Sequence, residues 1–146
     1  MSRGYSIVAL CSPKYEENVG GALRAAQAYG AAMVVCAAQR FRHRASDTGK
    51  AHRHVPLLTG WDDPLLVLPH ECEVVVVERW DWAKQLPEFK HPERAMYVFG
   101  PEDGSVDQGI KAMAHHIVQV PTRYCMNLAA TVNVVLYDRL AKEVRR

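Results

Sequence analysis

The chain has 146 residues, 49% of them apolar, and 18 basic against 16 acidic residues leave a formal net charge of +2. This length suits one domain that buries roughly 70% of its unfolded surface, and the small net charge does not by itself indicate a nucleic-acid-binding protein. No apolar stretch is long enough to span a bilayer, and no leader pattern begins the chain. The four cysteines are widely spaced and form no CxxC pair. We therefore expect a single domain over residues 1–146, cytoplasmic, with no membrane segment and no metal site.

Short apolar runs alternate with amphipathic segments along the chain. The apolar runs predict strands, at Tyr5–Cys11, Ala32–Ala37, Val74–Val77, Ala95–Phe99 and His116–Val120. The amphipathic segments predict helices, from Asn18 to Tyr29, from Val106 to Ala114 and from Cys125 to Val144. Asn18 is expected to cap the first helix and Gly30 to end it. This alternation predicts an α/β fold with a mostly parallel sheet and helices on both faces.

A basic cluster lies between the second and third predicted strands. Its arginines are Arg40, Arg42, Arg44 and Arg53, and one acid, Asp47, interrupts it. Such a cluster can follow a phosphate backbone, which would make binding strongly salt-dependent. The alternative is a solvated loop and helix face with no ligand.

Three further segments follow one another in a fixed order. The first is Asn18-Val19-Gly20-Gly21-Ala22-Leu23-Arg24, the second is Phe99-Gly100-Pro101-Glu102-Asp103-Gly104, and the third is Val120-Pro121 followed by Cys125-Met126-Asn127-Leu128. The second and third segments come directly after predicted strands, where ligands of open α/β sheets bind. Gly100 allows a close backbone approach and permits angles that other residues resist.

Together these segments resemble the motifs of the SpoU/TrmH branch of the SPOUT RNA methyltransferases: Asn-x-Gly-x-x-x-Arg, Phe-Gly-Pro-Glu-x-x-Gly and Ile-Pro…Ser-x-Asn-Leu/Val. The resemblance spans nearly the whole chain and is strongest to the minimal tRNA 2′-O-methyltransferases of the anticodon loop. It implies methyl transfer from S-adenosylmethionine to a ribose 2′-hydroxyl of RNA, with tRNA as the expected RNA and no additional RNA-binding domain. It also implies a homodimer and a C-terminal trefoil knot, which no sequence pattern alone would predict.

The resemblance also implies which residues bind the cofactor. The glycine matching Gly100 contacts it in relatives, and the residue matching Val120 binds it through the backbone. The whole expected set is Val77, Phe99, Gly100, Pro101, Val120, Cys125, Met126 and Leu128.

Four residues are expected to serve catalysis: Arg24, Asn18, Glu102 and Asn127. Methyl transfer needs the sulfur, the methyl carbon and the attacking oxygen in line at about 3 Å, and a way to remove the hydroxyl proton. Arg24 matches an arginine that relatives use near the RNA phosphate. Because a guanidinium with a pKa above about 12 is a poor base, we expect Arg24 to clamp phosphate, with the base left open.

Within these motifs, Asn18 and Arg24 are expected to address the same end of the sheet, and Glu102 to belong to the acidic wall of the site. Asn127 is expected to cap the last helix, to contact the active centre, or both.

Two residues depart from the family pattern: Gly21 stands where relatives often have asparagine, and Cys125 where they usually have serine. Whether these departures impair activity is not settled by the sequence, nor are the RNA, the modified nucleotide and the base preference. The alternative is a non-catalytic RNA-binding or ribosome-assembly factor that retains the fold. A nucleotide or flavin protein of the doubly wound class is disfavoured, since no GxGxxG follows the first strand.

The predicted last helix carries an apolar stripe made of Leu128, Val132, Val135 and Leu136. We expect this stripe to form the homodimer contact. The alternative is that it packs only within its own domain.

Overall fold

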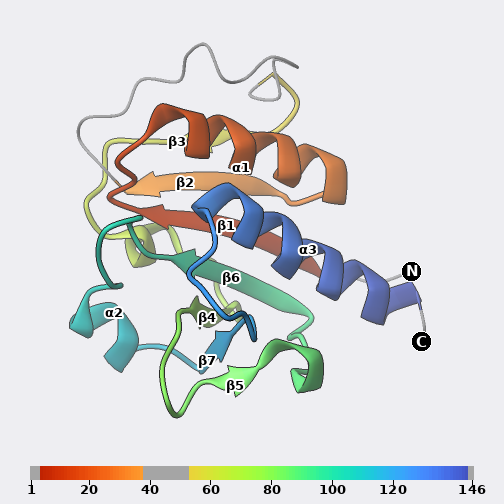
Figure 1. The fold of residues 1–146 in the computed structure, drawn as a ribbon. Helices are drawn as coiled ribbons and strands as arrows, with labels where there is room; N and C mark the ends of the chain where they lie inside the picture. The colour runs from red at the N-terminus through yellow and green to blue at the C-terminus, as the bar shows by residue number, and fades with distance from the viewer. Residues whose placement is uncertain (1–3, 38–52, 145–146) are drawn as a thin grey trace.

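The computed structural model describes residues 4–37 and 53–144, and its centre is one sheet of seven strands (Figure 1). The strand order is β3-β2-β1-β6-β4-β7-β5, and every described strand pairing is parallel. The strands are β1 (Tyr5–Cys11), β2 (Met33–Ala37), β3 (Leu57–Leu58), β4 (Glu73–Val77), β5 (Lys84–Gln85), β6 (Arg94–Phe99) and β7 (His116–Gln119).

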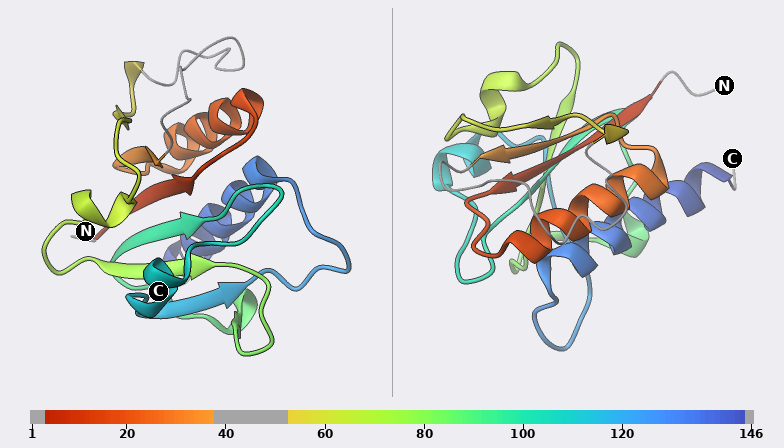
Figure 2. Two further views of the ribbon diagram at one scale, coloured as in Figure 1. Left: turned by 90° about the vertical axis from the view of Figure 1, so that its left-hand side faces the viewer. Right: turned by 90° about the horizontal axis from the view of Figure 1, so that it is seen from above.

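Helices cover both faces of this sheet, as the two further views in Figure 2 show. The long helices α1 (Glu16–Tyr29) and α3 (Leu128–Val144) pack side by side on one face. The short helix α2 (Gln108–Ala112) and the 3₁₀ helix η2 (Pro64–Val67) lie over the other face, and a second 3₁₀ helix, η3 (Leu86–Glu88), follows β5. The predicted α/β fold with a parallel sheet and helices on both faces is confirmed.

Alternating side chains of the central strands supply two apolar cores. In β1, Val8 and Leu10 join the core under α1 and α3, whereas Ile7 and Ala9 join the core on the opposite face. Because both faces are buried, the central strands read as continuous apolar runs. The valine run of β4 is an example, and its prediction as a central strand is confirmed.

Of the two ends of α1, only the carboxyl-terminal end agrees with the sequence prediction. Gly30 ends the helix in the left-handed conformation, with φ 73° and ψ 31°, and its N–H donates to the carbonyls of Ala26 and Gln27. The prediction that Asn18 caps the helix was wrong. Tyr15 occupies the cap position, without a side-chain hydrogen bond, and Asn18 lies buried in the first turn.

Gly21 sits at a close approach of α1 and α3. A Cβ atom at this position would lie 2.7 Å from the Cβ of Ala129 on α3, far inside the usual carbon–carbon contact of about 3.5–4.0 Å. Gly21 is therefore a packing requirement of this chain's helix pair. An asparagine at this position would need wider helix spacing.

The apolar stripe of α3 packs within its own domain, so its prediction as a dimer contact was wrong. Leu128, Val132, Val135 and Leu136 are each at most 6% exposed and belong to the core under α1 and α3. The trefoil knot stays a prediction. Within residues 4–37 and 53–144, no helix is long and apolar enough to span a membrane.

Candidate functional site

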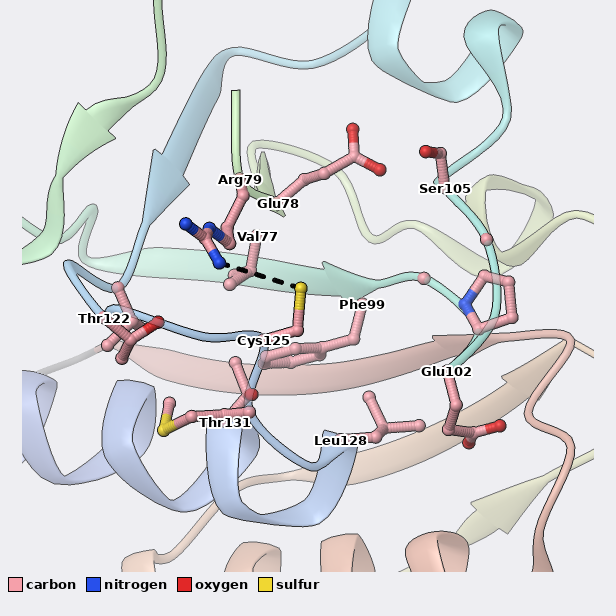
Figure 3. A pocket seen from close by; sticks show the side chains of 15 residues that line it. Val77, Glu78, Arg79, Phe99, Glu102, Ser105, Thr122, Cys125, Leu128 and Thr131 are labelled. Atoms are coloured by element: carbon pink, nitrogen blue, oxygen red, sulfur yellow. Dashed lines mark hydrogen bonds between the residues drawn. The ribbon is translucent and has the colours of Figure 1, made fainter. Parts of the chain in front are cut away.

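A cavity of about 280 Å³ opens at the carboxyl ends of β4, β6 and β7 (Figure 3). Its walls come from the segments that follow these strands and from the first turn of α3. The lining residues are Val77, Glu78, Arg79, Phe99, Gly100, Pro101, Glu102, Gly104, Ser105, Val120, Thr122, Cys125, Met126, Leu128 and Thr131. This is the sheet edge at which ligands of parallel α/β folds bind.

All eight residues predicted to bind the cofactor line this one cavity. They come from three segments that are far apart in the sequence: Val77 ends β4, Phe99 ends β6 and is followed by Gly100 and Pro101, and the remaining four follow β7. Parallel pairing of β4 with both β6 and β7 brings these three strand ends together.

Gly100 is required by a close backbone approach, and not by unusual backbone angles. A Cβ at Gly100 would lie 3.0 Å from the backbone N of Val106 and 3.2 Å from the carbonyl carbon of Ser105. Among the described glycines, Gly30 and Gly60 have φ in the left-handed region, and Gly100 does not. The expectation that Gly100 adopts angles closed to other residues was therefore wrong, and the loop folding back over it explains the glycine.

Two charged residues of the cavity were missed by the sequence analysis. Glu78 and Arg79 directly follow β4, and both line the cavity. Glu78 Oε1 accepts a hydrogen bond of 2.9 Å from the N–H of Val106, and its other oxygen forms an ion pair with Lys111. The available signal was their position, since charges directly after a buried parallel strand lie at the ligand-binding edge.

Arg79 also connects two walls of the cavity. Its Nη1 lies 3.8 Å from the Sγ of Cys125, across the opening (Figure 3). Cys125 is exposed, whereas burial raises the pKa of the Cys11 and Cys36 thiols to about 12 and raises that of Cys72. Cys125 is thus the most accessible thiol of the four.

Three of the four predicted catalytic residues form one hydrogen-bonded chain. The Nδ2 of Asn127 donates to Asn18 Oδ1 at 2.8 Å, and the Nδ2 of Asn18 donates to Glu102 Oε1 at 3.1 Å. The other Glu102 oxygen accepts from the N–H of Lys14 at 2.8 Å. Asn127 Oδ1 also accepts from the N–H of Ala130 at 3.1 Å, so Asn127 both caps α3 and joins this chain.

Arg24 lies apart from the other three. It is exposed on α1 and does not line the cavity. Six residues of helix place it about 9 Å further along the axis than Asn18 and about 120° away around it. The expectation that both residues address the same end of the sheet stays a prediction.

The basic cluster falls mainly outside the described residues. Arg40, Arg42 and Arg44 belong to residues 38–52, which lie outside the described ranges, and Arg53 is exposed. In the described part of the chain, no three His, Cys, Asp or Glu side chains form a group that could hold a metal ion.

Comparison with known proteins gives a family match over most of the chain. The family described as the SpoU rRNA methylase family matches residues 5–137. No curated protein sequence matches this chain.

Solved structures of similar fold include three that illustrate the range. The SpoU methyltransferase AviRb from Streptomyces viridochromogenes is 17% identical, with a TM-score of 0.82 over 99% of this chain and 62% of its own. The A. aeolicus TrmH/SpoU tRNA modifying enzyme is 18% identical, with a TM-score of 0.85 over 98% of this chain and 77% of its own. A structure described as giving insight into the 2-OH methylation of C/U34 on tRNA is 20% identical, with a TM-score of 0.80 over 99% of this chain and 94% of its own. This chain thus spans less than two thirds of the length of AviRb.

Proposed function

Because this chain belongs to the SpoU rRNA methylase family, we propose that it transfers a methyl group from S-adenosylmethionine to a ribose 2′-hydroxyl of RNA, with tRNA as the expected substrate. The observation that carries this proposal is the single cavity lined by all eight predicted cofactor-binding residues. AviRb has been solved in complex with AdoMet, and the relatives above include tRNA-modifying enzymes.

The chemistry of the cavity fits this cofactor. Val77, Phe99 and Leu128 give apolar walls suited to an adenine ring, whose edges the exposed backbone groups after β6 and β7 can recognise. Arg79 supplies an exposed positive charge that matches the carboxylate group of the methionine part. When bound, the cofactor supplies an electrophilic methyl group.

The chain's own residues must then orient the ribose and manage its proton. Asn18, Glu102 and Asn127 form one hydrogen-bonded chain, of which Glu102 lines the cavity. Such a preorganised chain can hold a hydroxyl at Glu102 without reorganising during the reaction. Arg24 has a fixed positive charge and is assigned to the RNA phosphate, where it stabilises the negative charge that develops on the attacking oxygen.

Cys125 provides a direct test of cofactor binding. Alkylation of the native protein with iodoacetamide should modify Cys125 first, because it is exposed and the other three thiols are more buried. Saturating S-adenosylmethionine should slow this modification, and methyl transfer from labelled cofactor to tRNA should then be measurable. Unprotected Cys125 together with no calorimetric binding would contradict the proposal and favour the non-catalytic RNA-binding alternative.

We also propose a homodimer that uses the exposed face of α3. Val134, Tyr137 and Leu140 are 36%, 59% and 40% exposed at three-residue spacing, and Tyr137 packs edge-on against Tyr29 of α1. Tyr137→Asp should convert a dimer to a monomer in light scattering. Met113→Asp, at an exposed apolar residue next to α2 on the other face of the sheet, is the control and should stay dimeric. A wild-type monomer at micromolar concentration would reject the dimer.

A cytoplasmic location is proposed on the state of the cysteines. All four are free thiols, and none is paired in a disulfide, which fits a reducing compartment.

A further inference from the structure

Two large aromatic side chains project into solvent beside the cavity. Trp82 and Tyr124 are each 82% exposed. Trp82 lies in the loop between β4 and β5, three residues after the cavity residue Arg79, and Tyr124 directly precedes the cavity residue Cys125. Arg79 and Cys125 approach each other to 3.8 Å, so the two loops meet at the cavity (Figure 3).

The loop that carries Trp82 is firmly held. The N–H of Ala83 donates to the carbonyl of Trp80 at 2.9 Å, and the side chain of Gln119 donates to the carbonyls of Trp80 and Ala83 at 2.9 and 3.2 Å. The Trp80 ring packs edge-on against the Trp82 ring, with the ring centroids 5.7 Å apart. The Nζ of Lys111 lies 5.3 Å from the centroid of the Trp80 ring. Trp82 is therefore presented outward by fixed backbone bonds.

The second loop is held in a similar way. Thr122 Oγ1 donates to the carbonyl of Tyr124 at 2.7 Å, and the N–H of Thr122 donates to the carbonyl of Val120 at 2.9 Å. An exposed aromatic ring on a fixed loop loses little conformational entropy when a flat ligand stacks on it.

The charges of these two loops favour an anionic partner. Arg79 and Arg123 are exposed in these loops, Lys84 is exposed at the start of β5, and Asp81 is the exposed acid of the two loops. Stacking aromatics interleaved with cations are the combination that binds single-stranded nucleic acid. In a duplex the base faces are already stacked on each other and are closed to such rings.

We propose that Trp82 and Tyr124 form a stacking surface for unpaired bases of the RNA substrate, beside the cavity that receives the target ribose. This inference rests on the proposed function and adds to it the two side chains that contact the bases. The bases next to the modified nucleotide stack on the two rings, and Lys84 and Arg123 contact the connecting phosphates.

Fluorescence anisotropy with a labelled single-stranded RNA, alone or annealed to its complement, tests this inference. Each ring lost from a stacked base costs about 1–3 kcal/mol, so Trp82→Ala should weaken single-strand binding by at least about fivefold, and the double variant with Tyr124→Ala by more. Trp82→Phe should retain most of the affinity. Both positions are exposed, so folding is expected to survive and is checked by circular dichroism.

Trp61→Ala is the matched control, because Trp61 is a partly exposed tryptophan on the segment between β3 and η2, and it should leave RNA affinity unchanged. Affinity for S-adenosylmethionine should be the same in all variants. Unchanged RNA affinity in the Trp82 and Tyr124 double variant, or equal wild-type affinity for single-stranded and duplex RNA, would overturn the inference. Neither outcome touches the proposed function, which depends on cofactor binding and methyl transfer.

Discussion

Replacing Gly100 by valine tests how the cavity is built. Even a Cβ at this position lies 3.0 Å from the backbone N of Val106 and 3.3 Å from its Cγ2, and the valine methyl groups extend further. Since the contact is with backbone, residues 105 and 106 must shift. The N–H of Val106 then moves from Glu78 Oε1, to which it donates at 2.9 Å.

The size of the effect follows from that hydrogen bond. A bond to a charged acceptor contributes about 1.5–3 kcal/mol, and a shift of Glu78 changes the charged wall of the cavity. We therefore expect Gly100→Val to weaken S-adenosylmethionine binding by at least about tenfold, equivalent to about 1.4 kcal/mol.

Isothermal titration calorimetry measures this effect, with thermal unfolding to show that the variant is folded. Leu66→Val, at an exposed residue of η2 that does not line the cavity, is the control, and its binding should stay within about threefold of wild type. Unchanged affinity in a folded Gly100→Val protein would refute the placement of the cofactor in this cavity.

Three further predictions concern catalysis, helix packing and pH. Arg24→Ala should lower methyl transfer to tRNA by about two orders of magnitude while calorimetric cofactor affinity stays the same; turnover within about twofold of wild type would make Arg24 an ordinary surface residue. Gly21→Asn should lower the urea-derived free energy of unfolding by about 1–3 kcal/mol, because any Cβ there overlaps Ala129. Burial lowers the pKa of His91 from 6.5 to about 4. As the pH falls, His91 is therefore protonated in the unfolded chain before it is protonated in the folded protein. The contribution of neutral His91 to the free energy of unfolding is complete above pH 6.5 and is lost towards pH 4, by up to about 3 kcal/mol. The loss between pH 7 and 5 should shrink in His91→Gln and persist in the control His70→Gln, whose side chain is exposed.

The sequence predicted the central part of the fold because its signals are local. Continuous apolar runs identified the five long strands, and Gly30 identified the end of α1. The edge strands β3 and β5 have two residues each, which is too short to form a pattern. Asn18 carries a capping signal, yet its side chain bonds to Glu102 and Asn127 instead, and those partners lie 84 and 109 residues away.

The candidate site was predictable where it depends on motifs and unpredictable where it depends on packing. The eight cavity residues lie in recognisable turns after strands, so their positions followed from the resemblance. The structural reason for a glycine at position 100 could not be predicted from the resemblance. The neighbour that excludes a side chain there is the loop that folds back at residues 105–106. The same holds for Gly21, whose neighbour Ala129 lies on another helix.

The carboxyl-terminal half of α3 is held by a buried polar network. The hydroxyl of Tyr97 lies 2.6 Å from Nδ1 of His91 and accepts from Nη1 of Arg139 at 3.0 Å, and His91 Nε2 lies 2.7 Å from Asp138. The neutral imidazole that the lowered pKa favours can accept from Tyr97 and donate to Asp138. Lys142 adds an ion pair with Asp138 and donates to two backbone carbonyls beside η3.

Helix α3 is therefore fixed at both ends, and this decides which parts of the site can adapt to a ligand. At its first turn, Asn127 links it to Asn18, and at its last turns Arg139 donates to the carbonyls of Pro92 and Glu93. Moving the helix would break buried charge-assisted bonds, each of which contributes about 1.5–3 kcal/mol. The loops after β4, β6 and β7 carry fewer buried side chains. Adjustment to the cofactor and RNA should therefore occur in the side chains of these loops, whose backbone bonds hold Trp82 and Tyr124 in place, with α3 as the rigid wall behind them.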